Sequence, residues 1–172
     1  MNWEQRCRNI QVILSDVDGV LTDGGIIFDN QGIETKKFHI RDGGGIKLWQ
    51  KAGFRFGIIT GRTSQIVKVR AAELALDVVR QGHLDKLTAM LEVLAEWDLE
   101  LEQACYIGDD LFDLKAVRHA GLGVAVADAA EEVRQAADLV TQLPGGHGAV
   151  RELVETVLKA QGRWEEVIRK YL

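Results

Sequence analysis

The stretch from Val12 to Thr22 constrains the fold of this chain more than any other segment. It begins with a run of apolar β-formers, and a run with little polar alternation is typical of a strand buried on both faces, as in a parallel sheet. Asp16 and Asp18 follow this run one residue apart. A carboxylate there is costly to bury unless a metal, a ligand or hydrogen bonds compensate. In open α/β sheets ligands collect at the carboxyl ends of strands, so Asp16 marks a candidate site, although an aspartate after a strand often only closes a turn.

Composition and charge limit the classes of function. A length of 172 residues predicts one domain, residues 1–172, and the 47% hydrophobic and 27% charged fractions are those of an ordinary globular protein. The net charge of -5, without a basic cluster, argues against nucleic acid or an anionic membrane as the main partner. Cys7 and Cys105 lack zinc-site spacing, Met1 to Asn9 lacks the apolar core of a signal peptide, and no apolar run approaches a membrane span. We therefore expect a reduced, cytoplasmic setting.

Strand and helix patterns alternate along the rest of the chain. This alternation predicts an α/β fold, a doubly wound, Rossmann-like parallel sheet with right-handed crossovers and no cap domain. After the first strand, the expected strands are 54–59, 78–79, 104–107, 122–126 and 139–140. The expected helices are 42–53, 64–74, 84–97, one ending near 120, 130–137, 149–160 and 164–171.

A hairpin is expected at residues 24–40, between the first strand and the first helix. Two β-like runs flank a turn-rich tetrapeptide there, and the segment is longer than a mere connection needs. We expect it to project as a flap over the strand ends, because a core without a cap needs another way to exclude water. Four apolar side chains of the flap would be exposed in a monomer, which suggests an interface: Ile27, Phe28, Phe38 and Ile40.

Polar residues fall at the predicted strand ends and adjoining helix starts. They are Asp16, Asp18, Thr60, Lys86, Asp109, Asp110 and Asp113. Carboxylates gathered at one rim of a sheet suit Mg²⁺, and a lysine and a hydroxyl beside them supply donors for phosphate oxygens. One carboxylate can then attack phosphorus, while a second protonates the leaving oxygen and later deprotonates water. Asp113 also fits a simpler role, a negative charge in the first turn of a helix.

Four motifs, in order, resemble those of haloacid-dehalogenase-type phosphatases. They are Asp16-Val17-Asp18-Gly19-Val20, Ile59-Thr60-Gly61-Arg62, Lys86, and Gly108-Asp109-Asp110-Leu111-Phe112-Asp113. The resemblance implies that Asp16 is the nucleophile and Asp18 the general acid/base. It also implies that Thr60 and Lys86 hold the phosphoryl group. Mg²⁺ would be bound by Asp16, the backbone carbonyl of Asp18, and Asp109, with support from Asp110.

The likeness extends across nearly the whole chain to a capless branch of that family. Residues 19–24, 41–46 and 145–152 resemble the phosphatases of 3-deoxy-D-manno-octulosonate 8-phosphate, an intermediate of lipopolysaccharide sugar synthesis. The resemblance implies a homotetramer in which the flap of one subunit helps to close a neighbouring site. It also implies an acidic sugar phosphate as substrate, bound by Thr60, Gly61, Arg62 and Lys86, with Arg70 as a further candidate.

Three alternatives remain open at this level. In this branch a basic residue after Thr60-Gly61, here Arg62, accompanies the eight-carbon substrate, and its guanidinium could bind the sugar carboxylate bidentately. The second candidate substrate is a nine-carbon sialic-acid-type 9-phosphate. Arg62 and Arg70 also fit helix-surface charges. A phospho-accepting receiver domain would share the aspartate, threonine and lysine; receivers, however, carry an acidic pair on the first strand and the acceptor on a later one.

Overall fold

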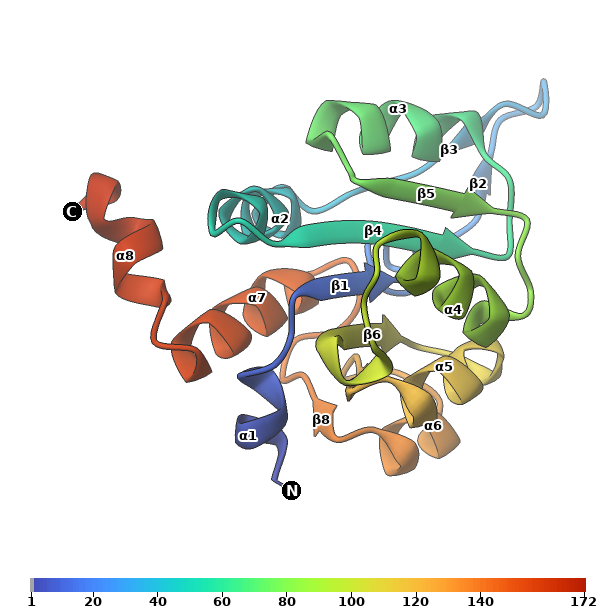
Figure 1. Cartoon of the computed structure of the whole chain (residues 1–172). Helices are drawn as coiled ribbons and strands as arrows, with labels where there is room; N and C mark the ends of the chain where they lie inside the picture. The colour runs from blue at the N-terminus through green and yellow to red at the C-terminus, as the bar shows by residue number, and fades with distance from the viewer. Residues whose placement is uncertain (1) are drawn as a thin grey trace.

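The computed structural model describes residues 2–172 and has a central sheet of six parallel strands (Figure 1). The strands are β1 (Val12–Ser15), β4 (Arg55–Thr60), β5 (Val78–Gln81), β6 (Ala104–Gly108), β7 (Leu122–Ala125) and β8 (Leu139–Val140). Their order is β5-β4-β1-β6-β7-β8, so the chain builds one half outward from β1 and then returns to build the other. The predicted doubly wound sheet is confirmed. Its direction of growth reverses between β1 and β6, where ligands of such folds bind.

Helices cover both faces of this sheet. They are α1 (Trp3–Cys7), α2 (Ile40–Lys51), α3 (Gln65–Leu74), α4 (Lys86–Glu96), α5 (Leu114–His119), α6 (Glu131–Ala136), α7 (Ala149–Ala160) and α8 (Trp164–Ile168). Right-handed crossovers that run in opposite directions put α2 and α3 on one face and α4 and α5 on the other. Helix α7 joins the first group by packing against α2, and α8 extends away from the sheet (Figure 1).

The contact between α2 and α7 depends on glycines and one buried acid of α2. A Cβ added to Gly45 would lie 2.9 Å from the Cα of Arg151, so only a glycine lets the two helices approach this closely. The carboxylate of Asp42 accepts hydrogen bonds from the amides of Gly148 (3.2 Å) and Arg151 (2.9 Å). Asp42 therefore caps the start of α7 across more than a hundred residues of sequence.

The hairpin is present but shorter than expected. Strands β2 (Ile27–Phe28) and β3 (Glu34–Thr35) pair antiparallel, and Asp29 closes the turn by accepting the amides of Gln31 and Ile33 at 2.8 Å each. Helix α2 begins at Ile40, so the predicted flap of 24–40 ends before its last residue. The hairpin projects beyond the ends toward which the sheet strands run (Figure 1). Residues 2–172 contain no cap domain, as predicted.

Exposure of the hairpin follows the prediction except at Phe38. Ile27 and Phe28 are more than half exposed, and Ile40 is 79% exposed. Phe38 is half-buried instead, because its ring lies under the guanidinium of Arg70, 5.7 Å from the ring centroid. A half-buried aromatic with a cation above it stabilises the return from the hairpin to α2.

Most element ends lie within two residues of the predicted ones, as usual where helices fray. The predicted helix 164–171 is α8 followed by a 3-10 turn, Arg169–Tyr171. Helix α1 was not predicted, and α4 begins at Lys86, after Asp85, which accepts the amide of Thr88 at 3.2 Å. Ser64 precedes α3 as expected, but its hydroxyl donates to Glu34 rather than to the helix.

Across the described part of the chain, the helices are too short or too polar to traverse a bilayer.

Candidate active site

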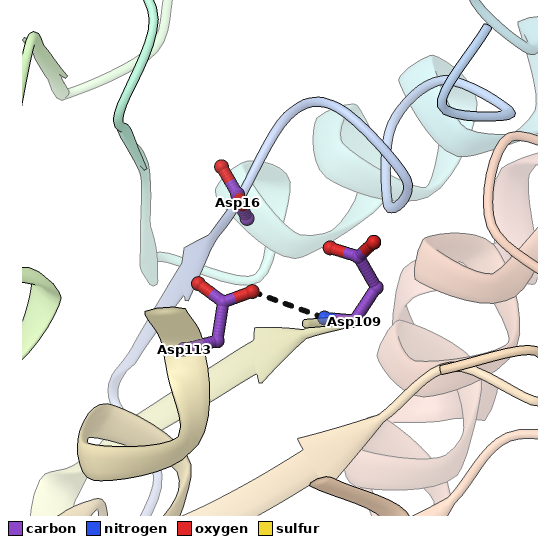
Figure 2. Close-up of side chains that lie close together, drawn as sticks. All are labelled: Asp16, Asp109 and Asp113. Atoms are coloured by element: carbon purple, nitrogen blue, oxygen red, sulfur yellow. Dashed lines mark hydrogen bonds between the residues drawn. The ribbon is translucent and has the colours of Figure 1, made fainter. Parts of the chain in front are cut away.

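The carboxyl ends of β1 and β6 bring Asp16 and Asp109 together. Asp16 directly follows β1 and its amide donates to the carbonyl of Ile107 at 3.0 Å, which ties it to the neighbouring strand β6. Asp109 directly follows β6. One carboxylate oxygen each of Asp16, Asp109 and Asp113 lies within 4.8 Å of the other two, and Figure 2 shows the three side chains around a common space. The predicted rim of carboxylates therefore exists, and Asp113 belongs to it.

Lys86 supplies the positive charge within this acidic group. Its side chain is 1% exposed, and Nζ lies 2.9 Å from Oδ1 of Asp16 and 3.4 Å from Oδ1 of Asp113. Nζ also donates to the carbonyl of Ile59 at 2.8 Å, beside the end of β4. The start of α4 and the carboxyl end of β4 thus hold the ammonium directly against Asp16.

The acidic group has more negative than positive charge, and its carboxylates are largely buried. Burial raises the pKa of Asp16 to about 6, an effect that Asp113 reinforces and Lys86 opposes. Burial likewise raises the pKa of Asp109 to about 8, with the charges of Asp113 and Asp16 adding to the shift. Within residues 2–172, Oδ1 of Asp109 is buried without a hydrogen-bond partner. A buried, unpartnered oxygen among repelling carboxylates fits a hard divalent cation such as Mg²⁺.

Asp113 holds the loop that presents Asp109. Its side chain is fully buried and accepts the hydroxyl of Tyr106 at 2.8 Å through Oδ1. Its Oδ2 accepts the amide of Asp109 at 3.1 Å, the dashed line in Figure 2. Both oxygens are therefore engaged by the protein, which makes Asp109 and Asp16 better cation ligands than Asp113. The expected first-turn position is also observed, since Asp113 ends a short 3-10 helix that runs into α5.

Glycines let three stretches of backbone meet at the acidic group. Gly19 has a φ of +90°, and a Cβ there would lie 2.0 Å from Oδ2 of Asp109. A Cβ on Gly145 would lie 1.7 Å from the carbonyl oxygen of Gly19. Gly19 therefore turns the chain sharply after Asp18, and Gly145, in the loop before α7, lies directly against this turn.

A cavity of about 280 Å³ opens over the acidic group. Its lining residues are Asp16, Asp18, Thr60, Gly61, Arg62, Leu84, Lys86, Asp109, Asp110 and Phe112. The sequence analysis gave no role to Leu84, which lies two residues before Lys86, or to Phe112, which lies within the fourth motif. Each of these apolar side chains is more than 60% exposed. A larger hollow of about 840 Å³ lies at the amino ends of the strands, away from this chemistry.

Arg70 is the one predicted binding residue that lies elsewhere within this chain. It lines a separate hollow with Phe38 and Ile40, and its guanidinium pairs with Glu73 at 2.8 Å. A Cβ on Gly43 would lie 2.4 Å from its Nη2, so Arg70 packs against the start of α2.

The hairpin contributes a second charged group that the sequence analysis missed. Lys36 forms an ion pair with Asp18, and its Nζ lies 3.4 Å from Glu34. Glu34 accepts Nη2 of Arg62 at 2.7 Å and the hydroxyl of Ser64 at 2.6 Å; the latter bond contributes most to lowering the pKa of Glu34. Nε of Arg62 lies 3.7 Å from Asp18. The alternation of Glu34 and Lys36 along β3 and its continuation was the available signal, since such residues share one face.

Known proteins share this sequence and architecture. A family model described as haloacid dehalogenase-like hydrolase matches residues 64–153. The 3-deoxy-D-manno-octulosonate 8-phosphate phosphatase of Yersinia pestis is 44% identical over 94% of this chain and 86% of its own length. The crystal structure of the Moraxella catarrhalis phosphatase of the same name, in complex with magnesium, phosphate and KDO, has a TM-score of 0.97 at 43% identity. It covers 99% of this chain and 98% of its own.

A third relative carries a different metal. The Haemophilus influenzae phosphatase of this name, in a cobalt-bound form, has a TM-score of 0.90 and 41% identity over 93% of this chain and 94% of its own. These identities span nearly the whole chain, and the site described above contains the four motifs in one cavity. The chain therefore belongs to the haloacid dehalogenase-like hydrolases and, within them, to the group of the 3-deoxy-D-manno-octulosonate 8-phosphate phosphatases.

Proposed function

We propose that this chain is a Mg²⁺-dependent phosphomonoesterase that hydrolyses 3-deoxy-D-manno-octulosonate 8-phosphate to the free sugar acid and phosphate, a step of lipopolysaccharide sugar synthesis. The observation that carries the proposal is that Asp16 and Asp109 lie close enough to share a cation at the floor of one cavity, with Lys86 paired to Asp16. The relative from Moraxella catarrhalis, which binds magnesium, phosphate and KDO, supports the same chemistry.

Asp16 is the proposed nucleophile. Its carboxylate attacks phosphorus, the bond from phosphorus to the sugar oxygen breaks, and an aspartyl phosphate forms. Asp18 donates a proton to the leaving oxygen and then takes one from the water that hydrolyses the acyl phosphate. Both side chains line the cavity, which supports their participation in the same reaction. Thr60 and Lys86 hold the phosphoryl oxygens through a hydroxyl and an ammonium.

Asp16, Asp109 and the backbone carbonyl of Asp18 are the proposed holders of Mg²⁺, with Asp110 in support. When bound, the ion neutralises phosphoryl charge that the carboxylates would otherwise repel. Asp16 and Asp109 suit this role because burial has raised their pKa values and one oxygen of Asp109 has no protein partner among the described residues. Asp113 fixes the amide of Asp109 and so orients the ligand without needing to bind the ion.

Arg62 is the proposed recognition group for the sugar carboxylate. It lines the cavity beside Gly61, and a guanidinium binds carboxylates in a planar, bidentate manner. Arg70 lies outside this cavity and reaches a substrate only if a second subunit completes the site.

A homotetramer is part of the proposal. The exposed apolar hairpin residues, together with Leu84 and Phe112 around the cavity mouth, support contact between the flap of one subunit and the site of a neighbour. We place the enzyme in the cytoplasm, where its two free, buried cysteines would stay reduced. Light scattering in solution tests the assembly, and a monomer with full selectivity would contradict it.

Hydrolysis of a substrate panel tests the function. The panel compares the eight-carbon 8-phosphate, a nine-carbon sialic-acid-type 9-phosphate and 4-nitrophenyl phosphate, each with Mg²⁺ and with a chelator. We expect the eight-carbon substrate to have the highest kcat/KM and the chelator to stop turnover. Asp16→Asn should lower kcat by about 10⁴-fold or more, because nucleophile removal has effects of that order. A preference for the simple ester, or turnover by Asp16→Asn at the native rate, would refute the assignment.

A further inference from the structure

The hairpin lysine, Lys36, stands behind Asp18 in the wall of the active site. Its side chain is 1% exposed although it belongs to a projecting segment, and its ammonium pairs with the carboxylate of Asp18. Its second neighbour is Glu34, 3.4 Å away on the same hairpin. Burial of an ammonium is unfavourable unless charges and hydrogen bonds compensate, so these two contacts account for its position.

Lys36 reaches the cavity only through Asp18. In the described part of the chain, Asp18 and Arg62 line the cavity, whereas Lys36 and Glu34 do not. Glu34 accepts hydrogen bonds from Arg62 and Ser64. The hairpin therefore contacts both Asp18, through Lys36, and Arg62, through Glu34, without itself lining the cavity. An ion pair of this kind fixes the rotamer of a carboxylate, and catalytic constellations need their side chains locked by such supporting contacts.

We propose that Lys36 is a positioning residue that holds the carboxyl group of Asp18 in the orientation from which its protonated form donates to the leaving oxygen. This inference rests on the proposed role of Asp18. It assigns the β-hairpin a task within its own subunit, distinct from any contact with a neighbour. The two neighbouring lysines differ sharply, since Lys37 is 64% exposed and pairs with Asp23 at 2.7 Å. Lys37 is therefore a matched control one residue away.

The test compares leaving groups. An alkyl phosphate such as the sugar 8-phosphate needs a proton on its leaving oxygen, whereas 4-nitrophenolate departs readily without one. General acid catalysis contributes about 10²–10⁴-fold, so Lys36→Met should lower kcat for the sugar phosphate by about 10-fold or more and for 4-nitrophenyl phosphate by less than about 3-fold. KM should change little for either substrate, because Lys36 does not line the cavity among residues 2–172. Lys37→Met should match the native protein on both substrates.

A double-mutant cycle separates positioning from a general loss of structure. In an Asp18→Asn background, Lys36→Met should have no further effect on either substrate, because the group through which it acts is gone. Equal losses for both leaving groups, or the same loss in the Asp18→Asn background, would overturn the proposal. If Lys36→Met is poorly folded by circular dichroism, Lys36→Gln, which removes the charge but keeps a polar side chain, is carried through the same cycle and must show the same leaving-group dependence. Turnover of the sugar phosphate by the native protein, measured alongside, reports on the proposed function independently.

Discussion

Two charged groups share the carboxyl edge of this sheet and are balanced in different ways. At the floor of the cavity, Asp16, Asp109 and Asp113 have one cation among residues 2–172, Lys86, and the pKa values of Asp16 and Asp109 are raised. The second group, the wall, consists of the carboxylates of Asp18 and Glu34 and the cations of Lys36 and Arg62. Here the numbers of opposite charges are equal, and the pKa of Glu34 is lowered. The floor therefore depends on positive charge from outside the chain, whereas the charges of the wall are balanced by Lys36 and Arg62 within the chain. The floor suits a metal and a phosphoryl group, and the wall suits a fixed geometry.

Removal of the one cation in the floor should have the largest effect. Lys86→Met leaves the carboxylates uncompensated, and breaking a buried ion pair in this way costs about 3–5 kcal/mol. The loss should be larger at pH 8 than at pH 6, because Asp16 and Asp109 take up protons as the pH falls and relieve the repulsion. Activity should fall by about 10²–10³-fold, the range for a lost electrostatic donor.

Urea unfolding in chelator at the two pH values measures this, with Lys159→Met, an exposed change on α7, as the control. A destabilisation that does not depend on pH would show that Lys86 matters through packing rather than through the charge balance of the floor.

Magnesium should stabilise the floor in a pH-dependent way. In metal-free protein the pKa of Asp109 is about 8 against an ordinary value of 3.8. The native state therefore binds more protons than the unfolded state between these values, and stability should fall as the pH rises from about 4 to 8. Mg²⁺ competes with those protons, so its stabilising effect should grow over the same interval, reaching about 2.7 kcal/mol at a hundredfold excess over Kd.

Thermal melts with Mg²⁺ and with chelator at pH 5.5 and 8 check this expectation. Asp109→Asn should abolish the shift that Mg²⁺ causes at pH 8. An equal shift at both pH values, or a shift that survives in Asp109→Asn, would place the ion elsewhere.

Neutralising one acid of the wall should have the smallest effect on stability. Glu34→Gln removes the charge that faces Arg62, whose side chain is 42% exposed, but keeps an acceptor for the hydroxyl of Ser64. It also removes the weaker contact of Glu34 with Lys36, which keeps its ion pair with Asp18. A pair with a partly exposed partner such as Arg62 contributes about 1 kcal/mol or less, because solvent screens it. Urea unfolding of Glu34→Gln beside Glu73→Gln, which removes a pair on α3, gives the comparison. A loss above that of Lys86→Met would reverse the contrast between floor and wall.

Sequence reasoning reached the floor of the site better than its wall. Asp16, Thr60 and Asp109 lie at the carboxyl ends of strands that apolar patterns reveal, and parallel topology then brings these residues to one edge. The ion pair of Lys36 with Asp18 depends on how the hairpin folds back over the strand ends, and the alternation of Glu34 and Lys36 alone does not specify that contact. The same holds for Arg70, whose helical position was evident while its direction, toward Phe38 and Gly43, depended on tertiary packing.

Long-range capping was also invisible in the sequence. Asp42 reads as a first-turn acid of its own helix, yet its carboxylate serves the amides at the start of α7. Nothing in the local sequence shows why Gly145 is a glycine, yet the backbone of Gly19 leaves no room for a side chain there. In each case the partner is distant along the chain, and only the assembled fold reveals why that residue type is present.

The contact of Gly19 with Asp109 and Gly145 also bears on how such a site could diversify. Because Gly19 brings no side chain to its contact with the carboxylate of Asp109, and Gly145 brings none to its contact with the carbonyl of Gly19, neither position has room for a larger residue. The distance between the two principal acids is consequently a property of the scaffold, and residue exchange cannot retune it in small steps. New substrate preferences in this architecture would have to arise at the hairpin and the cavity mouth, where side chains rather than peptide planes form the boundary.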